Sequence, residues 1–329
     1  MSPIHSLVRL PAPRVLLSLL PLVLAGGCYA DEADDPGLHE FRTTGSCTTC
    51  GLGFPNSPEI NDFEIPELHL DGALNSDGVQ LLRIRSATGS YPLHVIDEQF
   101  AVVLPNQTLS GADLLGWKID LDSPDGHYLL EIAGVDTIPS LADGAPPMVR
   151  YALKYESHLV PGEILNVCPE ATPDETVVTL IRDETYDREH KLVVPDQYGW
   201  FTLACADQAA YKMQRMNYGP NADFNGTPSP ATVDERQATL KMITADYCGK
   251  GFSFTAQGTP ILWRDADKTV GIEPPANAAL EAYWSADGAL CLDRPRLVGS
   301  QDVESECVLP PCSKIDVEDP RIVWTTHTN

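Results

Sequence analysis

The first 28 residues determine the compartment in which this chain folds, and therefore the chemistry of its cysteines. Arg9 and Arg14 precede an apolar run of ten residues, 15–24, which leads into small residues at 25–27 and then Cys28. This order of charged, apolar and small residues is typical of a secretory signal peptide. The run is too short for a membrane-spanning helix, which takes about 20 residues. The sequence therefore predicts a signal peptide over residues 1–27 and an oxidising compartment for the rest.

The end of this segment indicates how the chain is held after export. Residues 24–28 read Leu-Ala-Gly-Gly-Cys, which resembles the lipobox of bacterial lipoproteins, where the cysteine sulfur receives the lipid. The resemblance implies lipid attachment at Cys28 and anchoring in the bacterial cell envelope, at the outer membrane or the periplasmic face. Ordinary cleavage near Gly27 is the alternative, and it would make the protein secreted. Residues 28–60 are acidic at first and then Gly-rich, so we expect a tether.

The cysteines predict a disulfide-stapled body. With Cys28 assigned to lipid, eight cysteines remain, an even number that in an exported chain favours disulfides over a metal site. Proximity along the chain suggests Cys47 with Cys50 and Cys307 with Cys312 as local loops. The other four would then staple the body, although sequence alone cannot choose among the pairings. The eight are Cys47, Cys50, Cys168, Cys205, Cys248, Cys291, Cys307 and Cys312.

The charge balance excludes one class of partner. The chain has 22 basic and 47 acidic residues. Removing residues 1–27 takes away Arg9 and Arg14 and no acid, which leaves 20 basic residues and a net charge of −27. A nucleic-acid partner is not expected, because phosphate binding requires clustered Lys and Arg. The acidity itself is explained by solubility, with specific cation capture as the alternative.

The pattern of residues predicts a mainly β body. Alternating apolar residues over 63–70, 79–84 and 148–156 indicate strands with one buried face. Strand-like runs at 116–121 and 128–132 flank Asp-Ser-Pro-Asp-Gly, and runs at 280–284 and 289–292 flank Ser-Ala-Asp-Gly, so each pair predicts a hairpin. Further strands are expected at 177–181, 191–194 and 200–204.

Two short helices interrupt this β pattern. Helix-forming residues fill 207–216, and Thr232 followed by Glu235 predicts a capping box for a second helix that runs to about Ala245. The intervening residues 217–230 are rich in Asn, Gly and Pro and predict a loop. The expected fold class is therefore α+β, mainly β, with antiparallel sheets. We expect a body over 61–314, as one elongated unit or two abutting modules, and a C-terminal tail over 315–329.

No local motif predicts catalysis. Cys47 and Cys50 have CxxC spacing, but their Gly- and Thr-rich flanks favour a simple disulfide over a redox or zinc site. Asp265, Asp267 and Glu273 resemble a calcium loop without its required Gly and Glu, so a solvated turn is expected instead. We therefore expect no catalytic residue, cofactor or metal ligand, although an active site assembled from distant residues remains an alternative.

One group of segments resembles a known family. Residues 244–249 read Thr-Ala-Asp-Tyr-Cys-Gly after the second predicted helix. Upstream, residues 200–205 read Trp-Phe-Thr-Leu-Ala-Cys, and downstream Glu-Ala-Tyr-Trp and Asp-Gly-Ala-Leu-Cys lie within 281–291. Together they resemble the ADYC domain, a family of exported bacterial proteins with many myxobacterial members. The resemblance is most specific over 200–291 and implies export without implying an activity.

The motif residues Ala245, Asp246, Tyr247 and Cys248 suggest a structural role. We expect Gly249 to adopt the left-handed conformation that ends a helix, Tyr247 to be buried with its hydroxyl bonded, and Cys248 to form a disulfide. The alternative is a binding or catalytic role for Asp246 and Tyr247.

Three function classes follow from the sequence. The first is an envelope-tethered structural or interaction lipoprotein, attached to the membrane by its lipid, with a protein or glycan as its partner. The second is an acidic module that binds a cation or another ligand, and the third is an envelope hydrolase with a non-local active site.

Overall fold

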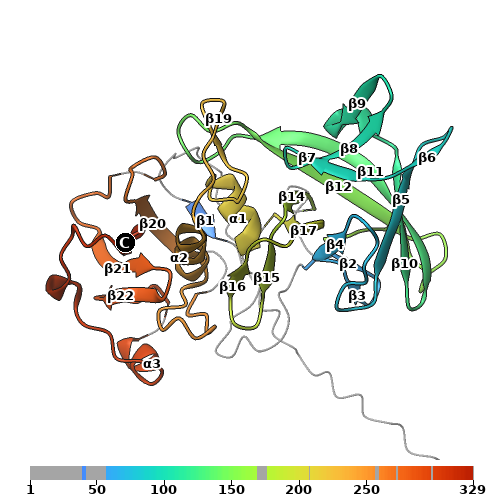
Figure 1. Ribbon diagram of the computed structural model, residues 1–329. Helices are drawn as coiled ribbons and strands as arrows, with labels where there is room; N and C mark the ends of the chain where they lie inside the picture. Colours follow the sequence, from blue (N-terminus) through green and yellow to red (C-terminus); the bar gives the residue numbers. More distant parts are fainter. Residues whose placement is uncertain are drawn as a thin grey trace, which may run out of the picture. The chain divides into compact units, whose positions relative to one another are not determined.

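The computed structural model describes residues 39–41, 57–168, 176–206, 208–255, 259–271, 273–297 and 299–328 (Figure 1). The predicted signal peptide, the lipid attachment residue Cys28, and Cys47 and Cys50 lie outside these residues. The described part consists mainly of antiparallel strands with three α-helices, which confirms the predicted fold class. None of the helices in these ranges is long and apolar enough to cross a membrane.

The larger sheet has nine strands among the described residues. Their order in space is β4-β17-β14-β12-β11-β10-β5-β6, and β13 also pairs with β12. The predicted hairpin around residues 122–126 is confirmed, because β10 and β11 pair from Lys118 with Glu131 to Ser123 with Gly126. The strands are β4 (Glu67–His69), β5 (Gln80–Arg85), β6 (Ser90–Tyr91), β10 (Lys118–Ser123), β11 (Gly126–Ile138), β12 (Met148–Glu156), β13 (Ile164–Asn166), β14 (Val178–Arg182) and β17 (Trp200–Cys205).

The larger sheet curves around the first hydrophobic core. Along β12, Tyr151, Leu153 and Tyr155 are buried while Lys154 and Glu156 are exposed, as the alternation predicts. β4 at one edge of the sheet contacts β5 near the other edge, so the sheet closes partly on itself. A three-stranded sheet of β7 (His94–Ile96), β8 (Gln99–Leu104) and β9 (Gln107–Ser110) contributes Phe100, which packs on Tyr151 in the same core.

The second sheet has the order β1-β20-β23-β21-β22 and a core of its own, which includes Trp284 and Trp324. Its strands are β1 (His39–Phe41), β20 (Thr259–Asp265), β21 (Ala279–Ser285), β22 (Gly288–Leu292) and β23 (Trp324–Thr328). The predicted hairpin of β21 and β22 is confirmed. The expectation of a C-terminal tail over 315–329 is wrong for β23, which lies between β20 and β21 and buries Trp324 completely.

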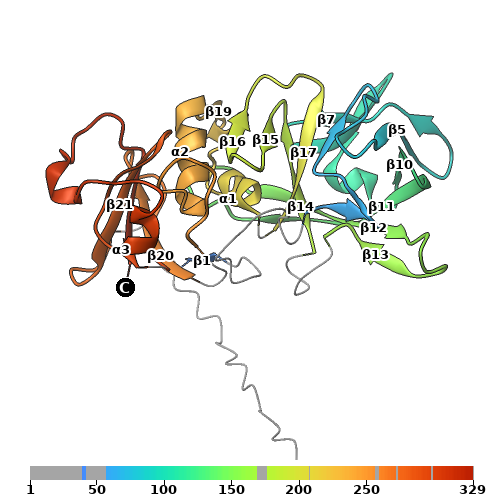
Figure 2. The ribbon, with the colours of Figure 1, turned by 90° about the horizontal axis from the view of Figure 1, so that it is seen from below.

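Two helices lie between the sheets, as Figures 1 and 2 both show. Helix α2 (Val233–Thr244) contacts β21, β22 and β23, whereas α1 (Ala209–Arg215) contacts α2, β14 and β17. The capping box is confirmed, because Thr232 Oγ1 accepts a hydrogen bond from Glu235 N (3.2 Å) and the Glu235 carboxylate accepts one from Thr232 N (2.6 Å). Both helices were expected from the sequence.

The remaining elements are short. Three two-stranded hairpins are β2 (Glu59–Ile60) with β3 (Phe63–Glu64), β15 (Thr185–Asp187) with β16 (Leu192–Val194), and β18 (Asp223–Phe224) with β19 (Thr227–Pro228). The last of these lies within the stretch that we expected to be a loop. Helix α3 (Ser300–Glu304) and the 3-10 turns η1 (Gly111–Leu114) and η2 (Cys312–Lys314) were not predicted.

Candidate functional site

The Ala-Asp-Tyr-Cys motif lies where α2 ends and the chain turns towards β21 and β22. Ala245 is the residue that ends the helix, with a left-handed backbone (φ 50°). Gly249, which we expected to have this role, comes four residues later with φ +67°, and a Cβ there would lie 2.0 Å from the carbonyl oxygen of Asp287. Gly249 therefore does not cap the helix. It allows the loop to contact the β21–β22 turn closely, a contact that any side chain would prevent.

Asp246 is a fully buried carboxylate at the centre of this loop. Its Oδ2 forms an ion pair with Lys241 Nζ at 2.7 Å and accepts a hydrogen bond from Gly251 N at 2.7 Å. Its Oδ1 accepts a hydrogen bond from Lys250 N at 3.0 Å. Lys241 is also buried and donates to the carbonyl oxygen of His190 at 3.1 Å. Asp246 therefore ties the loop to helix α2 and to the segment that leads into β16.

A second buried cation lies close to this pair. Lys191 is 6% exposed, and its Nζ donates to the carbonyl oxygen of Gly251. Burial lowers the pKa of Lys191, while Asp246 raises it in part. Gln237 on α2 supports the same segment, because it donates to the carbonyl of Lys191 (2.9 Å) and accepts from Val193 N (2.9 Å). Asp246 is thus the carboxylate that balances two buried lysines.

Tyr247 joins the loop to the second sheet. Its ring is 1% exposed and stacks on Trp284 with the ring centroids 5.1 Å apart. Its hydroxyl donates to Glu281 Oε1 and accepts from Arg296 N at 3.1 Å. Glu281 and Arg296 form a fully buried ion pair, with Nε to Oε1 at 2.7 Å. Burial raises the pKa of Tyr247 well above its ordinary value, so the hydroxyl stays protonated and remains a donor.

Three disulfides join the described cysteines, which confirms the stapled body. Cys248 bonds to Cys307 and Cys291 to Cys312, with Cα atoms 5.7 and 4.8 Å apart. The predicted local pair of Cys307 with Cys312 is therefore wrong. Cys307 and Cys312 both lie in the segment after β22. Cys307 joins this segment to the loop that contains Cys248, and Cys312 joins it to β22 through Cys291.

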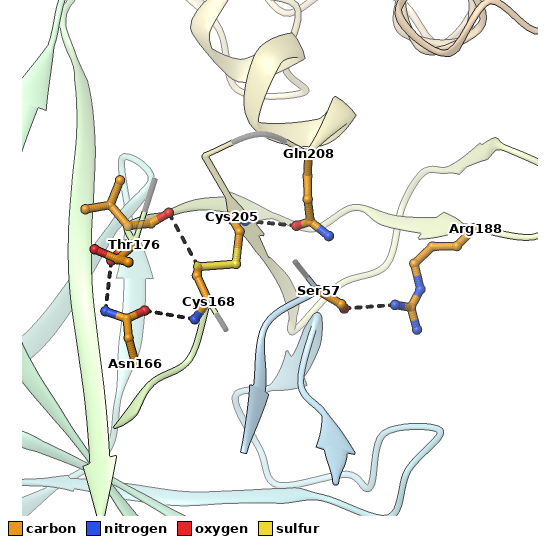
Figure 3. Close-up of a disulfide and its surroundings, with 8 residues drawn as sticks. Ser57, Asn166, Cys168, Thr176, Arg188, Cys205 and Gln208 are labelled. Carbon is orange, nitrogen blue, oxygen red and sulfur yellow. Dashed lines mark hydrogen bonds between the residues drawn. A yellow bond between two sulfur atoms is a disulfide. The ribbon is translucent and has the colours of Figure 1, made fainter. Parts of the chain in front are cut away.

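The third disulfide lies in the larger sheet and joins Cys168 to Cys205, as Figure 3 shows. On one side, Asn166 accepts a hydrogen bond from Cys168 N (2.8 Å) and donates to the carbonyl of Thr176 (2.9 Å). On the other side, the Gln208 side chain accepts from Cys205 N (2.8 Å). The bridge thus holds the chain beyond β13 against the end of β17, just before α1 begins.

The family model of the ADYC domain matches residues 111–298, which include the motif, both helices and the β21–β22 hairpin. This chain belongs to the ADYC domain family. No curated protein and no solved structure matches it. In this ADYC domain the four residues that give the family its name are all buried or half-buried, and Asp246, Tyr247 and Cys248 all bond to other parts of the fold.

The described acidic residues do not form a metal site. No group of three or more His, Cys, Asp or Glu side chains placed to hold a metal occurs in the described ranges. Asp265 is buried, so the expectation of a solvated turn is wrong for it. It accepts hydrogen bonds from Thr269 N (2.8 Å), Thr269 Oγ1 (2.6 Å) and the Tyr218 hydroxyl (3.2 Å). Glu273 pairs with Arg264 instead of converging on this turn.

A cationic cluster on the outer face of the larger sheet was missed from the sequence. Arg83, Arg85 and His127 surround Asp120, whose side chain is fully buried beneath them. Arg85 Nε donates to Asp120 Oδ2 at 2.7 Å and Arg83 Nε lies 3.4 Å from the same oxygen, while His127 Nε2 contacts Oδ1. The three basic side chains are 50%, 42% and 42% exposed, in that order. They come from β5 and β11, on either side of β10.

A surface hollow of about 280 Å³ begins beside this cluster, at the edge of the larger sheet. Arg83 is part of the cationic cluster and also lines the hollow. The other lining residues are mainly apolar and come from β5, from β6 with the residues after it, and from the end of β4: Leu70, Leu81, Leu82, Ser90, Tyr91, Pro92 and Leu93. A hollow of this size can hold part of a small organic ligand.

A second pocket lies between β4, β17, the β15–β16 hairpin and the helices. Glu67 and Lys191 contribute to its wall, and burial raises the pKa of Glu67. Its volume is about 50 Å³, which is enough for only a few water molecules. The pocket is too small to carry a functional assignment.

Proposed function

We propose that this ADYC protein is an exported lipoprotein, anchored through Cys28, that acts by binding a partner at its surface. The observation that carries the proposal is the contrast between the motif and the cationic cluster. Inside the fold, Asp246 pairs with Lys241 and Glu281 pairs with Arg296. The basic side chains around Asp120, in contrast, are 42–50% exposed to solvent. Buried ion pairs of this kind fix a fold and are not accessible to a substrate.

The disulfides support the proposal that the protein is exported. Three bridges in one chain indicate an oxidising environment outside the cytoplasm. Together they staple the larger sheet, the motif loop and the last segment.

The cation-binding alternative has less support. It rested on the convergence of Asp265, Asp267 and Glu273, but Asp265 accepts hydrogen bonds within its own turn and Glu273 pairs with Arg264. The hydrolase alternative needs a nucleophile and a base that share a cleft, and no specific observation favours it.

The anchoring is tested by mass spectrometry and fractionation of the protein from its native host. We expect a mature N-terminus at Cys28 with added acyl mass, and we expect Cys28→Ala to move the protein from the membrane to the soluble fraction. A Cys47→Ala variant is the matched control and should stay with the membrane. Membrane-bound protein that still begins at Met1 would contradict the proposal.

A further inference from the structure

We propose that Arg83, Arg85 and His127 form a binding site for a phosphate or sulfate ester whose organic part occupies the neighbouring hollow. The proposal rests on the proposed binding function and names the chemistry of the ligand.

Asp120 brings the three basic side chains together, and Arg85 is hydrogen-bonded to it. One carboxylate serves two guanidinium groups and an imidazole, and its own side chain has no exposure to solvent. Arg85 donates to Asp120 through Nε and Nη2, Arg83 Nε lies 3.4 Å from the same oxygen, and His127 Nε2 contacts the other oxygen. The three side chains remain 42–50% exposed, so part of each lies in solvent where an anion can reach it. Guanidinium groups suit tetrahedral oxyanions because they donate two parallel hydrogen bonds.

The neighbouring charges define the direction of approach. Lys118 and Glu131 on the same face form an ion pair at 3.5 Å, so their charges offset each other. Asp122 is the cross-strand neighbour of His127 and makes that end of the cluster acidic. An anion is thus favoured on the opposite side, over Arg83 and Arg85. The chain is strongly acidic overall, but repulsion between exposed charges falls off within about 8 Å at physiological salt.

The hollow begins on this favoured side. The pairing of β5 with β10 shifts at Leu82, so that Arg83 pairs with Asp120 and Leu81 with Leu121. Leu82 is the extra residue of this β-bulge, a distortion that is common beside binding sites. Leu81, Leu82 and Tyr91 give the hollow an apolar wall, and Tyr91 is itself supported by Trp117 with ring centroids 5.6 Å apart. An inorganic anion would fill only the cluster, whereas an ester fills both parts.

The ligand chemistry is tested by calorimetric titration of the mature protein with phenyl phosphate, phenyl sulfate, inorganic phosphate and phenol. We expect both esters to bind at least tenfold more tightly than inorganic phosphate, and phenol not to bind measurably. A preference between the two esters identifies phosphate or sulfate as the natural group. Equal binding of phenol and the esters, or no binding of either ester, would overturn the proposal while leaving the anchoring through Cys28 untouched.

Variants separate the two halves of the site. Arg83→Gln should weaken both esters at least tenfold, and Ser90→Phe, which fills the hollow without touching Asp120, should remove the preference for esters over inorganic phosphate. Arg321→Gln is the matched control, because Arg321 also forms an exposed ion pair, with Asp319 at 2.7 Å, on another part of the chain. Melting temperatures verify that each variant is folded. Ester binding that is unchanged in both Arg83→Gln and Ser90→Phe would refute the site.

Discussion

The substitution Asp246→Asn tests how strongly the motif stabilises the fold. From the sequence alone the change looks mild, since Asn keeps the shape of Asp. The structure predicts a severe effect, because Asp246 neutralises the buried Lys241 (2.7 Å) and its Oδ2 also accepts from Gly251 N (2.7 Å). The amide of Asn would place an N–H donor against Lys241 Nζ or one of the backbone N–H groups, which are donors themselves. Leaving a buried charge without its partner costs about 3–5 kcal/mol, a large share of a typical stability of about 5–15 kcal/mol.

Urea denaturation of the disulfide-intact protein, monitored by circular dichroism, measures this loss of unfolding free energy. Lys241→Met alone should cost less than Asp246→Asn, because the carboxylate keeps its hydrogen bonds from Lys250 N and Gly251 N. In the double variant the costs should be non-additive by about 1–3 kcal/mol, as expected for residues in contact. Additive costs, or a loss below about 1 kcal/mol for Asp246→Asn, would show that the ion pair of Asp246 and Lys241 does not stabilise the fold.

Three further predictions concern Tyr247, the disulfides and the buried carboxyl group of Glu98. Tyr247→Phe keeps the ring stacked but leaves the buried Glu281 without one donor, so the free energy of unfolding should fall by about 1–3 kcal/mol, with Tyr247→Ala costing more in the same denaturation assay. Replacing Cys248 and Cys307 together by Ser removes a disulfide between residues 59 positions apart, so the free energy of unfolding should fall by about 2–5 kcal/mol. In the unmodified protein, alkylation without reduction should modify none of the described cysteines. Burial raises the pKa of Glu98 from 4.5 to about 7, so its contribution to stability is full below pH 4.5 and is lost as the pH rises through 7. Glu98→Gln should therefore weaken the pH dependence of the melting temperature over this range, and an unchanged profile would contradict the shift.

The local features of this fold were predictable because each depends on residues close in sequence. Alternation marked β12, turn residues marked the β10–β11 hairpin, and Thr232 with Glu235 marked the start of α2. The burial of Tyr247 was also expected. Such signals act within one strand, turn or helix, so no knowledge of distant partners is needed.

Features that depend on pairing between distant segments were missed. The cationic cluster requires Arg83, Asp120 and His127 to meet across three strands, and the bulge at Leu82 sets which β5 residues face Asp120. Cys307 lies five residues from Cys312, yet each bonds to a cysteine of another segment. The position of β23 in the middle of its sheet likewise depends on partners 40 or more residues away. Composition and spacing carry no information on such register.

We expect the Ala-Asp-Tyr-Cys motif to hold the fold together and not to serve as a binding site. Amide hydrogen exchange of the motif loop measures this most directly, because the amides of Lys250 and Gly251 are bonded to the buried carboxylate of Asp246. We expect these amides to exchange as slowly as those of β21, by global unfolding only, and to be unaffected by phenyl phosphate. Exchange as fast as that of the exposed loop at 158–163, or slowing of the motif amides on addition of a ligand, would show that the motif does not hold the fold together or that it binds a ligand.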